Sequence, residues 1–499
     1  DNINHKRSYQ RRADGNIFDV SIWKTGYYQI IDIEPASDPL SSHAQSAIGR
    51  SLSEILSEKS LQCVLSNAAL QIRELIGYDR VMIYKFHRDG HGEVVAEEKE
   101  VTLESWMGLH YPASDIPRQA RELYKFNLIR LIADVSTVPS GLCAGKNVLA
   151  PLDLTHSNLR AVSPIHIQYL KNMGVASSFS VSIIEDGELW GLIACHSYSP
   201  KIIGYEQREN AKLIGQVLGS AISFRERQEL QINVANHTQA LDAISRNLSR
   251  NLPIEQALIT GEVKMNEIIP CLGAAVYTQG KLHLTENAPD AVFIHQFISW
   301  LDQEIKEEGY YISNRLSTDF PPAAAYRKSA SGVLACRLGK NLSEYLLWFR
   351  PEIISTVRWA GNPEKTITSD QQGMTHISPR NSFVEWKERV EYSSLPWLES
   401  EQNAATILRD EVNFAINRQT IELRAMHEKL RQAYSELDTF SYTIAHDLKT
   451  PLTTIKSFAQ LLSRGSLSKQ KIVDIVGRIN HSTDKIKSPA AGSMNDLGI

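Results

Sequence analysis

The sequence predicts an α+β fold in which two mixed sheet domains are joined by long helices and followed by a coiled coil and a helical hairpin. Between Leu52 and about Arg225, stretches with apolar residues at helical spacing alternate with stretches in which apolar and polar residues alternate strictly, which is typical of a mixed sheet domain. Residues 205–251 contain no proline and only two glycines, so they predict one long helix. Past Pro396, apolar residues recur at steps of three and four, which predicts a coiled coil.

The composition limits the class of protein. A chain of 499 residues is long enough for three or four domains, each with its own core. The 53 Lys and Arg against 57 Asp and Glu give a net charge of −4, which excludes general binding to nucleic acid or to anionic membranes. Five scattered cysteines without CxxC pairs favour reduced thiols over a disulfide framework or a zinc site. With no membrane-length apolar run and no signal peptide, we expect a cytoplasmic protein without metal ligands.

The first sheet domain is predicted element by element. Residues 61–76 have the apolar spacing of a helix, whereas residues 80–86 and 178–184 alternate as half-buried strands. Residues 188–195 are mostly apolar, which predicts a strand in the centre of the sheet. Ahead of this domain, residues 17–34 form two β-rich runs separated by Lys24-Thr-Gly26, which is a hairpin signal.

A second mixed domain is predicted from about Leu252 to Pro396. Its stretch 360–382 is dense in Gly, Pro, Ser and Thr, so it cannot form a rigid core element on its own. We expect an extended arm there.

A heptad seam follows the second domain. Its polar flanks and its direct continuation into the next helix favour a parallel two-stranded coiled coil, and the alternative is one amphipathic helix packed on its own domain. A second helix at about 468–487 would complete a helical hairpin, and residues 489–499 resemble a linker or a truncated end. The seam consists of Leu423, Met426, Leu430, Ala433, Leu437, Phe440 and Ile444.

Two segments of the first domain read Tyr111-Pro-Ala-Ser-Asp-Ile-Pro117 and Leu159-Arg-Ala-Val-Ser-Pro-Ile-His-Ile-Gln-Tyr-Leu-Lys-Asn-Met-Gly-Val175. They resemble the bilin-binding GAF domain of phytochromes. The resemblance implies a pocket for a linear tetrapyrrole, because ordinary side chains cannot absorb red light. The second segment also indicates the pigment, since Ile165 stands where plant-type phytochromes carry their linking cysteine. The family members without that cysteine use biliverdin, linked through a cysteine ahead of the PAS domain, and no such cysteine is present in this chain.

The flanking segments resemble the same family. Residues 17–34 are similar to the last strands of its PAS domain, and residues 346–352, 359–363 and 378–386 are similar to its PHY domain. We therefore expect a PAS remnant at 1–36, a GAF domain at 37–225 and a PHY domain at 226–400 with its tongue at about 350–392. A helical spine at 205–251 would be shared between the GAF and PHY domains. A coiled-coil linker would follow at 401–440, a phosphoacceptor hairpin at 441–488 and an end segment at 489–499.

The resemblance also implies the pocket residues. Arginines would pair with the two propionates, hydroxyl groups would add neutral donors, and Asp115 and His166 would meet the pyrrole nitrogens. Aromatic residues and His196 would surround the ring that isomerises, and Tyr124 belongs either to that set or to the core. Cys195, inside a strand, is expected to be a buried core thiol. The complete set is Tyr84, Tyr111, Asp115, Ile116, Pro117, Tyr124, Arg130, Arg160, Ser163, His166, Tyr169, Ser178, Ser180 and His196.

The tongue would supply the switch. Arg380, in a motif that also contains Ser382, resembles the family's arginine that pairs with the pocket aspartate in one of two photostates. Such a buried pair is better suited to selecting a state than to stabilising the fold, because desolvation offsets much of its attraction. Which photostate is the dark state stays open.

The output motif is Ser441-Tyr-Thr-Ile-Ala-His-Asp-Leu-Lys-Thr-Pro-Leu452, which resembles the phosphoacceptor box of sensor histidine kinases. His446 would accept phosphate, with Asp447 orienting its ring. Thr450 would position water if the protein is a phosphatase, and the motif leaves kinase and phosphatase open. ATP and Mg²⁺ would act only through an ATP-binding domain that is absent from this chain. The expected partners are a second copy, through 412–488, and a response regulator.

Two other classes of function compete with this photoreceptor hypothesis. One is a light-independent ligand sensor, since GAF-like domains also bind other small molecules. The other is a dimerisation scaffold with a vestigial pocket.

Overall fold

The structure is a computed structural model, and it consists of two compact units. One unit comprises Asp1–Ile244 and Leu258–Thr406, and the other comprises Ser245–Ala257 and Ile407–Ile499. The described residues are 7–13, 15–25, 28–36, 49, 53–54, 58, 60–143, 152–250, 252–305, 309–339, 343–362, 368–369, 375–376 and 383–487.

A small antiparallel sheet opens the first unit. Its strands are β1 (Arg7–Ala13), β2 (Asn16–Thr25) and β3 (Tyr28–Pro35), in the order β1-β2-β3. The predicted hairpin is confirmed, because β2 and β3 pair up to Thr25↔Tyr28. Strand β1 was not predicted, and the assignment of this region to a PAS domain stays a prediction.

The central sheet has eight strands in the order β18-β15-β6-β5-β4-β9-β8-β7. Strand β9 lies between β4 and β8, so the prediction of a central apolar strand is confirmed. The strands from the first domain are β4 (Arg80–Phe86), β5 (Gly92–Lys99), β6 (Leu109–Tyr111), β7 (Ile129–Ile132), β8 (Ser177–Glu185) and β9 (Glu188–Ser197).

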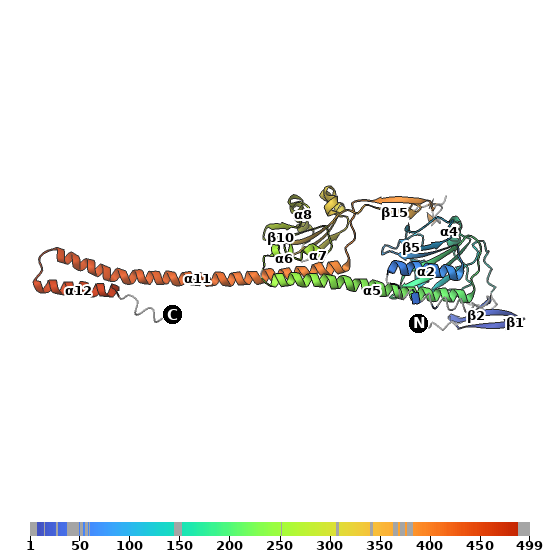
Figure 1. The fold of residues 1–499 in the computed structure, drawn as a ribbon, viewed down its shortest axis with the longest axis horizontal. Helices are drawn as coiled ribbons and strands as arrows, with labels where there is room; N and C mark the ends of the chain where they lie inside the picture. Colours follow the sequence, from blue (N-terminus) through green and yellow to red (C-terminus); the bar gives the residue numbers. More distant parts are fainter. Residues whose placement is uncertain are drawn as a thin grey trace. The chain divides into compact units, whose positions relative to one another are not determined.

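Helices α2 (Leu61–Ile76) and α5 (Tyr205–Ser249) lie along one face of this sheet (Figure 1). Because successive strand side chains point to opposite faces, Val81 and Ile83 of β4 pack into the core with these helices. Met82 and Tyr84 belong to a second apolar cluster on the other face. The central strands are therefore buried on both sides.

The two glycines of α5 mark its closest approach to the sheet. A Cβ on Gly219 would lie 2.3 Å from the backbone oxygen of Ile184, and one on Gly215 would lie 2.6 Å from Cγ1 of Val181. Residues that weaken a helix by propensity thus allow this helix to pack closely on β8.

A second, five-stranded sheet has the order β11-β10-β14-β13-β12. Every residue of β13 and β14 is buried, and α8 packs on this sheet through Phe293 and Phe297. The strands are β10 (Gly273–Thr278), β11 (Lys281–Leu284), β12 (Tyr310–Ser313), β13 (Gly332–Arg337) and β14 (Tyr345–Arg350). The helices around it are α6 (Ile254–Leu258), α7 (Met265–Ile268), α8 (Ala291–Glu304), α9 (Leu316–Asp319), η1 (Pro321–Tyr326) and α10 (Arg327–Ala330).

An extended arm leaves the second sheet and joins the first. Strands β15 (Ser355–Ala360) and β18 (Glu385–Val390) pair with each other, and β15 pairs in parallel with β6. Between them, β16 (Thr368–Ser369) and β17 (Thr375–His376) form a short antiparallel pair. The arm therefore adds two strands to the edge of the central sheet.

The second unit is helical. Helix α11 (Glu399–Ser463) begins in the first unit, and α12 (Lys469–Lys487) runs back beside its end (Figure 1). This confirms the predicted second helix of the hairpin. Apolar seam side chains of α11 are exposed in the single chain, among them Leu423 at 57% and Met426 at 68%.

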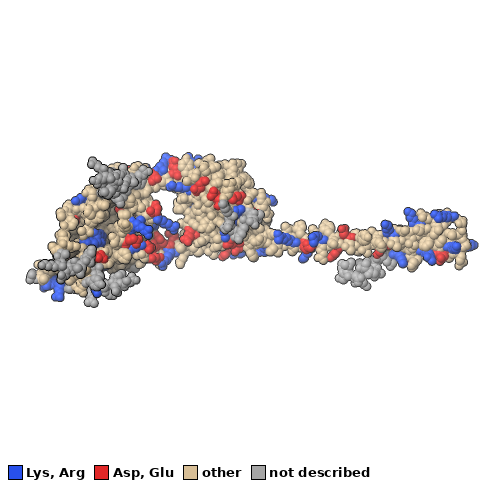
Figure 2. Space-filling view, turned by 180° about the vertical axis from the view of Figure 1, so that it is seen from behind, with Lys and Arg blue, Asp and Glu red and all other residues tan. Residues whose placement is uncertain are grey.

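The surface agrees with the balanced composition. Lys and Arg side chains are interspersed with Asp and Glu over the face drawn in Figure 2. Among the described helices, none combines the length and the apolar character needed to cross a membrane.

We predict that Gly219→Ala lowers the free energy of unfolding of the first unit by about 1–3 kcal/mol, because the new Cβ must push the backbone of β8 away. Helix propensity alone predicts the opposite sign, a gain of about 1 kcal/mol. Urea denaturation followed by tryptophan fluorescence measures the difference. In the control, Gly477→Ala in α12, the Cβ meets nothing within 4 Å, so stability should stay unchanged or rise. An unchanged or higher midpoint for Gly219→Ala would contradict the close packing.

Candidate functional site

A cavity lies on the face of the central sheet opposite α2 and α5. Strands β4, β8 and β9 supply one wall, and helices α3 (Arg118–Phe126) and α4 (Pro164–Asn172) supply other parts of the lining. Most of the predicted pocket residues meet here, namely Tyr84, Tyr111, Asp115, Ile116, Tyr124, Arg130, His166, Tyr169, Ser178, Ser180 and His196. Their roles toward a pigment stay predictions.

Three predicted residues do not line this cavity. Pro117 and Ser163 are exposed at the N-caps of α3 and α4, where the chain turns into a helix at the surface. Arg160 donates from Nη1 to the backbone oxygen of Ser157 at 2.6 Å. Burial, together with a smaller contribution from the charge of Arg130, lowers the pKa of Arg160 to about 10. The two guanidinium groups therefore repel each other, and an anion near them would relieve that repulsion.

Two histidines on the cavity wall are uncharged at neutral pH. Burial lowers the pKa of His196 to about 3 and that of His166 to about 4, with smaller contributions from Arg80 and Arg130 respectively. His196 is only 7% exposed, and its Nδ1 has no hydrogen-bond partner among the described residues. An unsatisfied buried polar atom costs about 1–3 kcal/mol, so this nitrogen favours a ligand that supplies a partner.

Two hydrogen bonds hold Asp115 in the lining of the cavity. Its backbone N–H donates to the carbonyl of Pro112 at 2.9 Å, and the hydroxyl of Tyr169 donates to its Oδ2 at 3.3 Å. Tyr111 beside it is buried, which raises the pKa of its phenol. The carboxylate thus connects the turn after β6 to helix α4.

The arm contacts the same wall. Phe383 packs edge-on against Tyr169 with ring centroids 5.1 Å apart, and it joins an apolar cluster with Met82 and Tyr84. The sequence analysis did not predict this contact, although Phe383 is the last residue of the motif that contains Arg380. Arg380 and Ser382 themselves lie outside the described residues.

The apolar part of the lining was also missed. Most of it lies two or four residues from predicted strand positions, or four residues from predicted positions on α4, so the strand and helix periods could have found it. Val94 is the exception, because it pairs with Tyr84 from the neighbouring strand β5. The additional residues are Met82, Val94, Ile132, Leu170, Met173, Leu192 and Ala194.

The phosphoacceptor motif lies on α11. The side chain of His446 is 69% exposed, and its Nδ1 lies 3.2 Å from Oδ1 of Asp447, as expected for an orienting carboxylate. Thr450 donates its hydroxyl to the backbone oxygen of His446 at 3.3 Å. The imidazole is therefore open to a reactant from solvent.

Family models match three parts of the chain in sequence order. Residues 60–224 match the GAF domain, residues 237–421 match the phytochrome region named PHY, and residues 436–488 match the His Kinase A (phospho-acceptor) domain.

Curated relatives extend this similarity over most of the chain. Cyanobacterial phytochrome B of Nostoc sp. is 37% identical over 428 residues, which cover 84% of this chain and 57% of the relative. The bacteriophytochrome of Pseudomonas aeruginosa is 34% identical over 463 residues, which cover 91% of this chain and 61% of the relative. The chain thus spans a little more than half the length of these relatives.

Two solved structures share the fold. A bacteriophytochrome from the photosynthetic bacterium R. palustris matches with a TM-score of 0.70 and 30% identity over 83% of each chain. The photosensory core module of a Stigmatella aurantiaca phytochrome matches with a TM-score of 0.68 and 33% identity over 82% of each chain. The chain therefore belongs to the phytochrome family of photoreceptors, and it carries the phosphoacceptor domain of the histidine kinases.

Proposed function

We propose that this chain is the light-sensing and phosphoacceptor part of a cytoplasmic red/far-red photoreceptor that binds a biliverdin-type tetrapyrrole. Its tongue and a dimeric coiled coil would pass the light signal to a histidine-kinase or phosphatase output. The observation that carries this proposal is the cavity in which Asp115, Arg130 and two uncharged histidines converge. A bound bilin supplies the absorption of red light and the double-bond isomerisation that side chains cannot provide.

The polar residues fit a linear tetrapyrrole with two carboxylates and several pyrrole N–H groups. Arg130 lines the cavity and would pair with a propionate, while Arg160 lies close enough to affect a carboxylate placed near Arg130. His166 and His196 can accept an N–H because their lone pairs are free of protons at neutral pH. Asp115 offers a carboxylate to the same groups.

The chemistry of the wall supports the biliverdin type. Among the described residues that line the cavity there is no cysteine, and Ile165 precedes His166. Cys195 is buried within β9, and burial raises the pKa of its thiol, so little nucleophilic thiolate forms at neutral pH. A pigment linked through the GAF domain is therefore disfavoured.

The arm would act as the tongue that senses the pigment's state. Phe383 touches the cavity-lining Tyr169, and β15 pairs with β6 just ahead of Asp115. We propose that Arg380 pairs with Asp115 in one photostate only, so that refolding of the arm follows isomerisation.

The output would need two chains and a second protein. The exposed seam of α11 supports a parallel dimer through residues 412–488, because burying those side chains against a partner removes apolar surface from water. His446 would receive the γ-phosphate of ATP from a separate ATP-binding domain and pass it to a response regulator.

We predict that protein mixed with biliverdin gains a red or far-red absorption band that shifts reversibly between two illumination colours. Asp115→Ala should keep the pigment but lose a charge-assisted hydrogen bond worth about 1.5–3 kcal/mol. The photostate that needs this bond should then revert in the dark roughly 10- to 100-fold faster. Absorption spectra and dark-reversion rates measure both effects.

The matched control is Asp153→Ala, an exposed turn aspartate outside the cavity, which should revert like the wild type. Arg380→Ala should accelerate reversion of the same state, and the double variant should be no faster than the faster single variant if the two residues form a pair. Failure of biliverdin to bind, or binding without a reversible shift, would exclude the photoreceptor proposal. Additive effects in both states would exclude the state-selective pair.

We also predict that His446 is the sole phosphorylated residue in a longer protein that includes an ATP-binding domain. Inserting one to three residues at about Ala433 rotates the helix by roughly 100° per residue, so light regulation should weaken or invert. A seven-residue insertion should restore much of it, because it preserves the heptad phase. Radiolabel from ATP, counted under the two illuminations, measures the response.

Incorporation of phosphate into a His446→Gln variant would contradict the assignment. His427→Gln, another exposed histidine on α11, is the matched control and should label normally. If the light response does not depend on the length of the insertion, the light signal is not transmitted through the coiled coil.

A further inference from the structure

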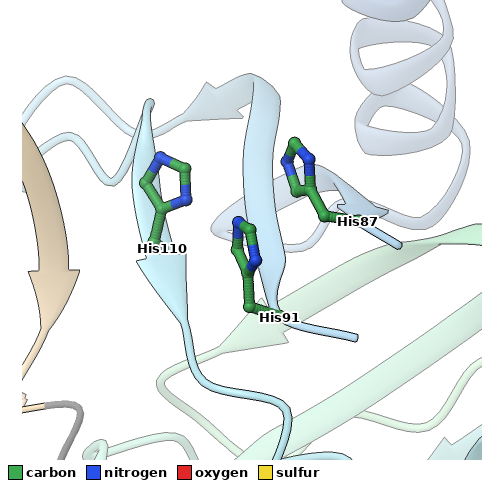
Figure 3. Close-up of side chains that lie close together, drawn as sticks. All are labelled: His87, His91 and His110. Atoms are coloured by element: carbon green, nitrogen blue, oxygen red, sulfur yellow. The ribbon is translucent and has the colours of Figure 1, made fainter. Parts of the chain in front are cut away.

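Three histidines gather beside the arm, outside the cavity described above. His87 follows β4, His91 precedes β5 in the same turn, and His110 lies in β6 (Figure 3). The turn brings the first two together, since the backbone N–H of His87 donates to the carbonyl of His91 at 2.8 Å. The rings of His87 and His91 are stacked with centroids 4.2 Å apart, and those of His91 and His110 are 5.2 Å apart.

Carboxylates hold one nitrogen of two of these rings. Nε2 of His87 lies 2.9 Å from Oε2 of Glu93, and Nδ1 of His91 lies 2.5 Å from Oδ1 of Asp89. A carboxylate that accepts one ring N–H leaves the lone pair of the other nitrogen available, which is the usual arrangement around metal-binding histidines.

The third ring has a spare ligand atom. Nδ1 of His110 is buried and has no hydrogen-bond partner among the described residues. Such a nitrogen is available to coordinate a metal ion.

The spacing is close to that of a coordination sphere. One ligand atom from each histidine lies within 4.8 Å of the other two. Three nitrogens at about 2.0–2.1 Å from a tetrahedral zinc ion lie roughly 3.4 Å apart. Side-chain rotations that bring the ligand nitrogens roughly 1–1.5 Å closer together would therefore complete the site. All three rings are partly exposed, which leaves a path for an ion.

We propose that His87, His91 and His110 form a binding site for one divalent transition metal ion of the zinc class. Imidazole nitrogens suit Zn²⁺, Cu²⁺ and Ni²⁺, whereas Mg²⁺ and Ca²⁺ prefer oxygen ligands. A water molecule would complete the tetrahedron.

The position of the site connects it to the arm. Trp359 of β15 faces His110 in the strand pairing, and its ring centroid lies 5.6 Å from that of His110 and 5.7 Å from that of His91. An ion that fixes these two rings would stiffen the surface on which Trp359 rests. Metal binding should therefore stabilise the pairing of β15 with β6. This inference goes beyond the proposed function and needs no pigment.

The site is tested by isothermal titration of Zn²⁺ into pigment-free, chelator-treated protein that carries no histidine tag. Wild type should bind with a dissociation constant in the micromolar range or below. Glu93→Gln removes a supporting carboxylate, so it should weaken this binding roughly 10- to 100-fold, and His110→Asn should weaken it more. His427→Asn, an exposed histidine on α11, should bind like the wild type, and Mg²⁺ should give no comparable heat.

Circular dichroism of each variant separates loss of a ligand from loss of the fold, and His91→Asn provides a second ligand variant if His110→Asn does not fold. Absence of Zn²⁺ binding to the wild type below millimolar concentration would overturn the proposal. Equal affinity in the His91, His110 and His427 variants would overturn it as well.

Hydrogen exchange tests the connection to the arm. Amides of β15 and β6 should exchange more slowly when Zn²⁺ is added to the wild type, and His91→Asn should abolish that slowing. Zn²⁺ binding that leaves exchange in β15 unchanged would overturn the coupling while leaving the metal site in place.

Discussion

The two-sided burial of strands β4, β8 and β9 is the constraint on which the rest of the first unit depends. Val81 and Ile83 face α2 and α5, while Met82 and Tyr84 face the cavity. Because the side-chain period of a strand is two, a shift of register by one residue would exchange these sets and destroy both the core and the site. The packed helices thereby fix the residues that a ligand can meet, and the glycines of α5 allow those helices to lie close enough to do so.

Placing polar groups on the second face has an energetic cost. Arg130, His166 and His196 are withdrawn from water, and burial lowers the pKa of each, which means that the protein must hold a cation or an imidazole in surroundings that disfavour charge. Nδ1 of His196 remains without a protein partner in the described part of the chain. Functional sites commonly violate the rule that buried polar groups are satisfied, and a ligand then compensates for the violation.

The attachment of the arm is short. Strand β6 has three residues, and its parallel ladder with β15 covers only Arg358↔Leu109 and Trp359↔His110. The other anchors of the arm include the ring contact of Phe383 with Tyr169 and a hydrogen bond from Arg358 to the carbonyl of Met107 at 3.2 Å. A ladder of two residue pairs is much easier to open than the long pairing of β8 with β9, so the arm is suited to changing its conformation while the sheet keeps its own.

The elements whose signals are local could be predicted from the sequence. The hairpin of β2 and β3, helix α2, strand β4, the length of α5 and helix α12 all follow from residue periodicity and turn residues within a single segment. The motifs around Asp115 and His166 also predict a pocket, through their resemblance to the GAF domain of phytochromes.

Folding of the whole chain determines which distant segments meet. It brought β15 to β6, Phe383 to Tyr169 and His110 to the turn of His87 and His91, and it left Pro117, Arg160 and Ser163 off the cavity wall. The cysteine spacing predicts no metal site, and the histidine cluster forms only because β6 pairs with β5. The physical reason is that strand pairing and side-chain packing join residues far apart in the chain, and no local pattern records which partner a strand edge will find.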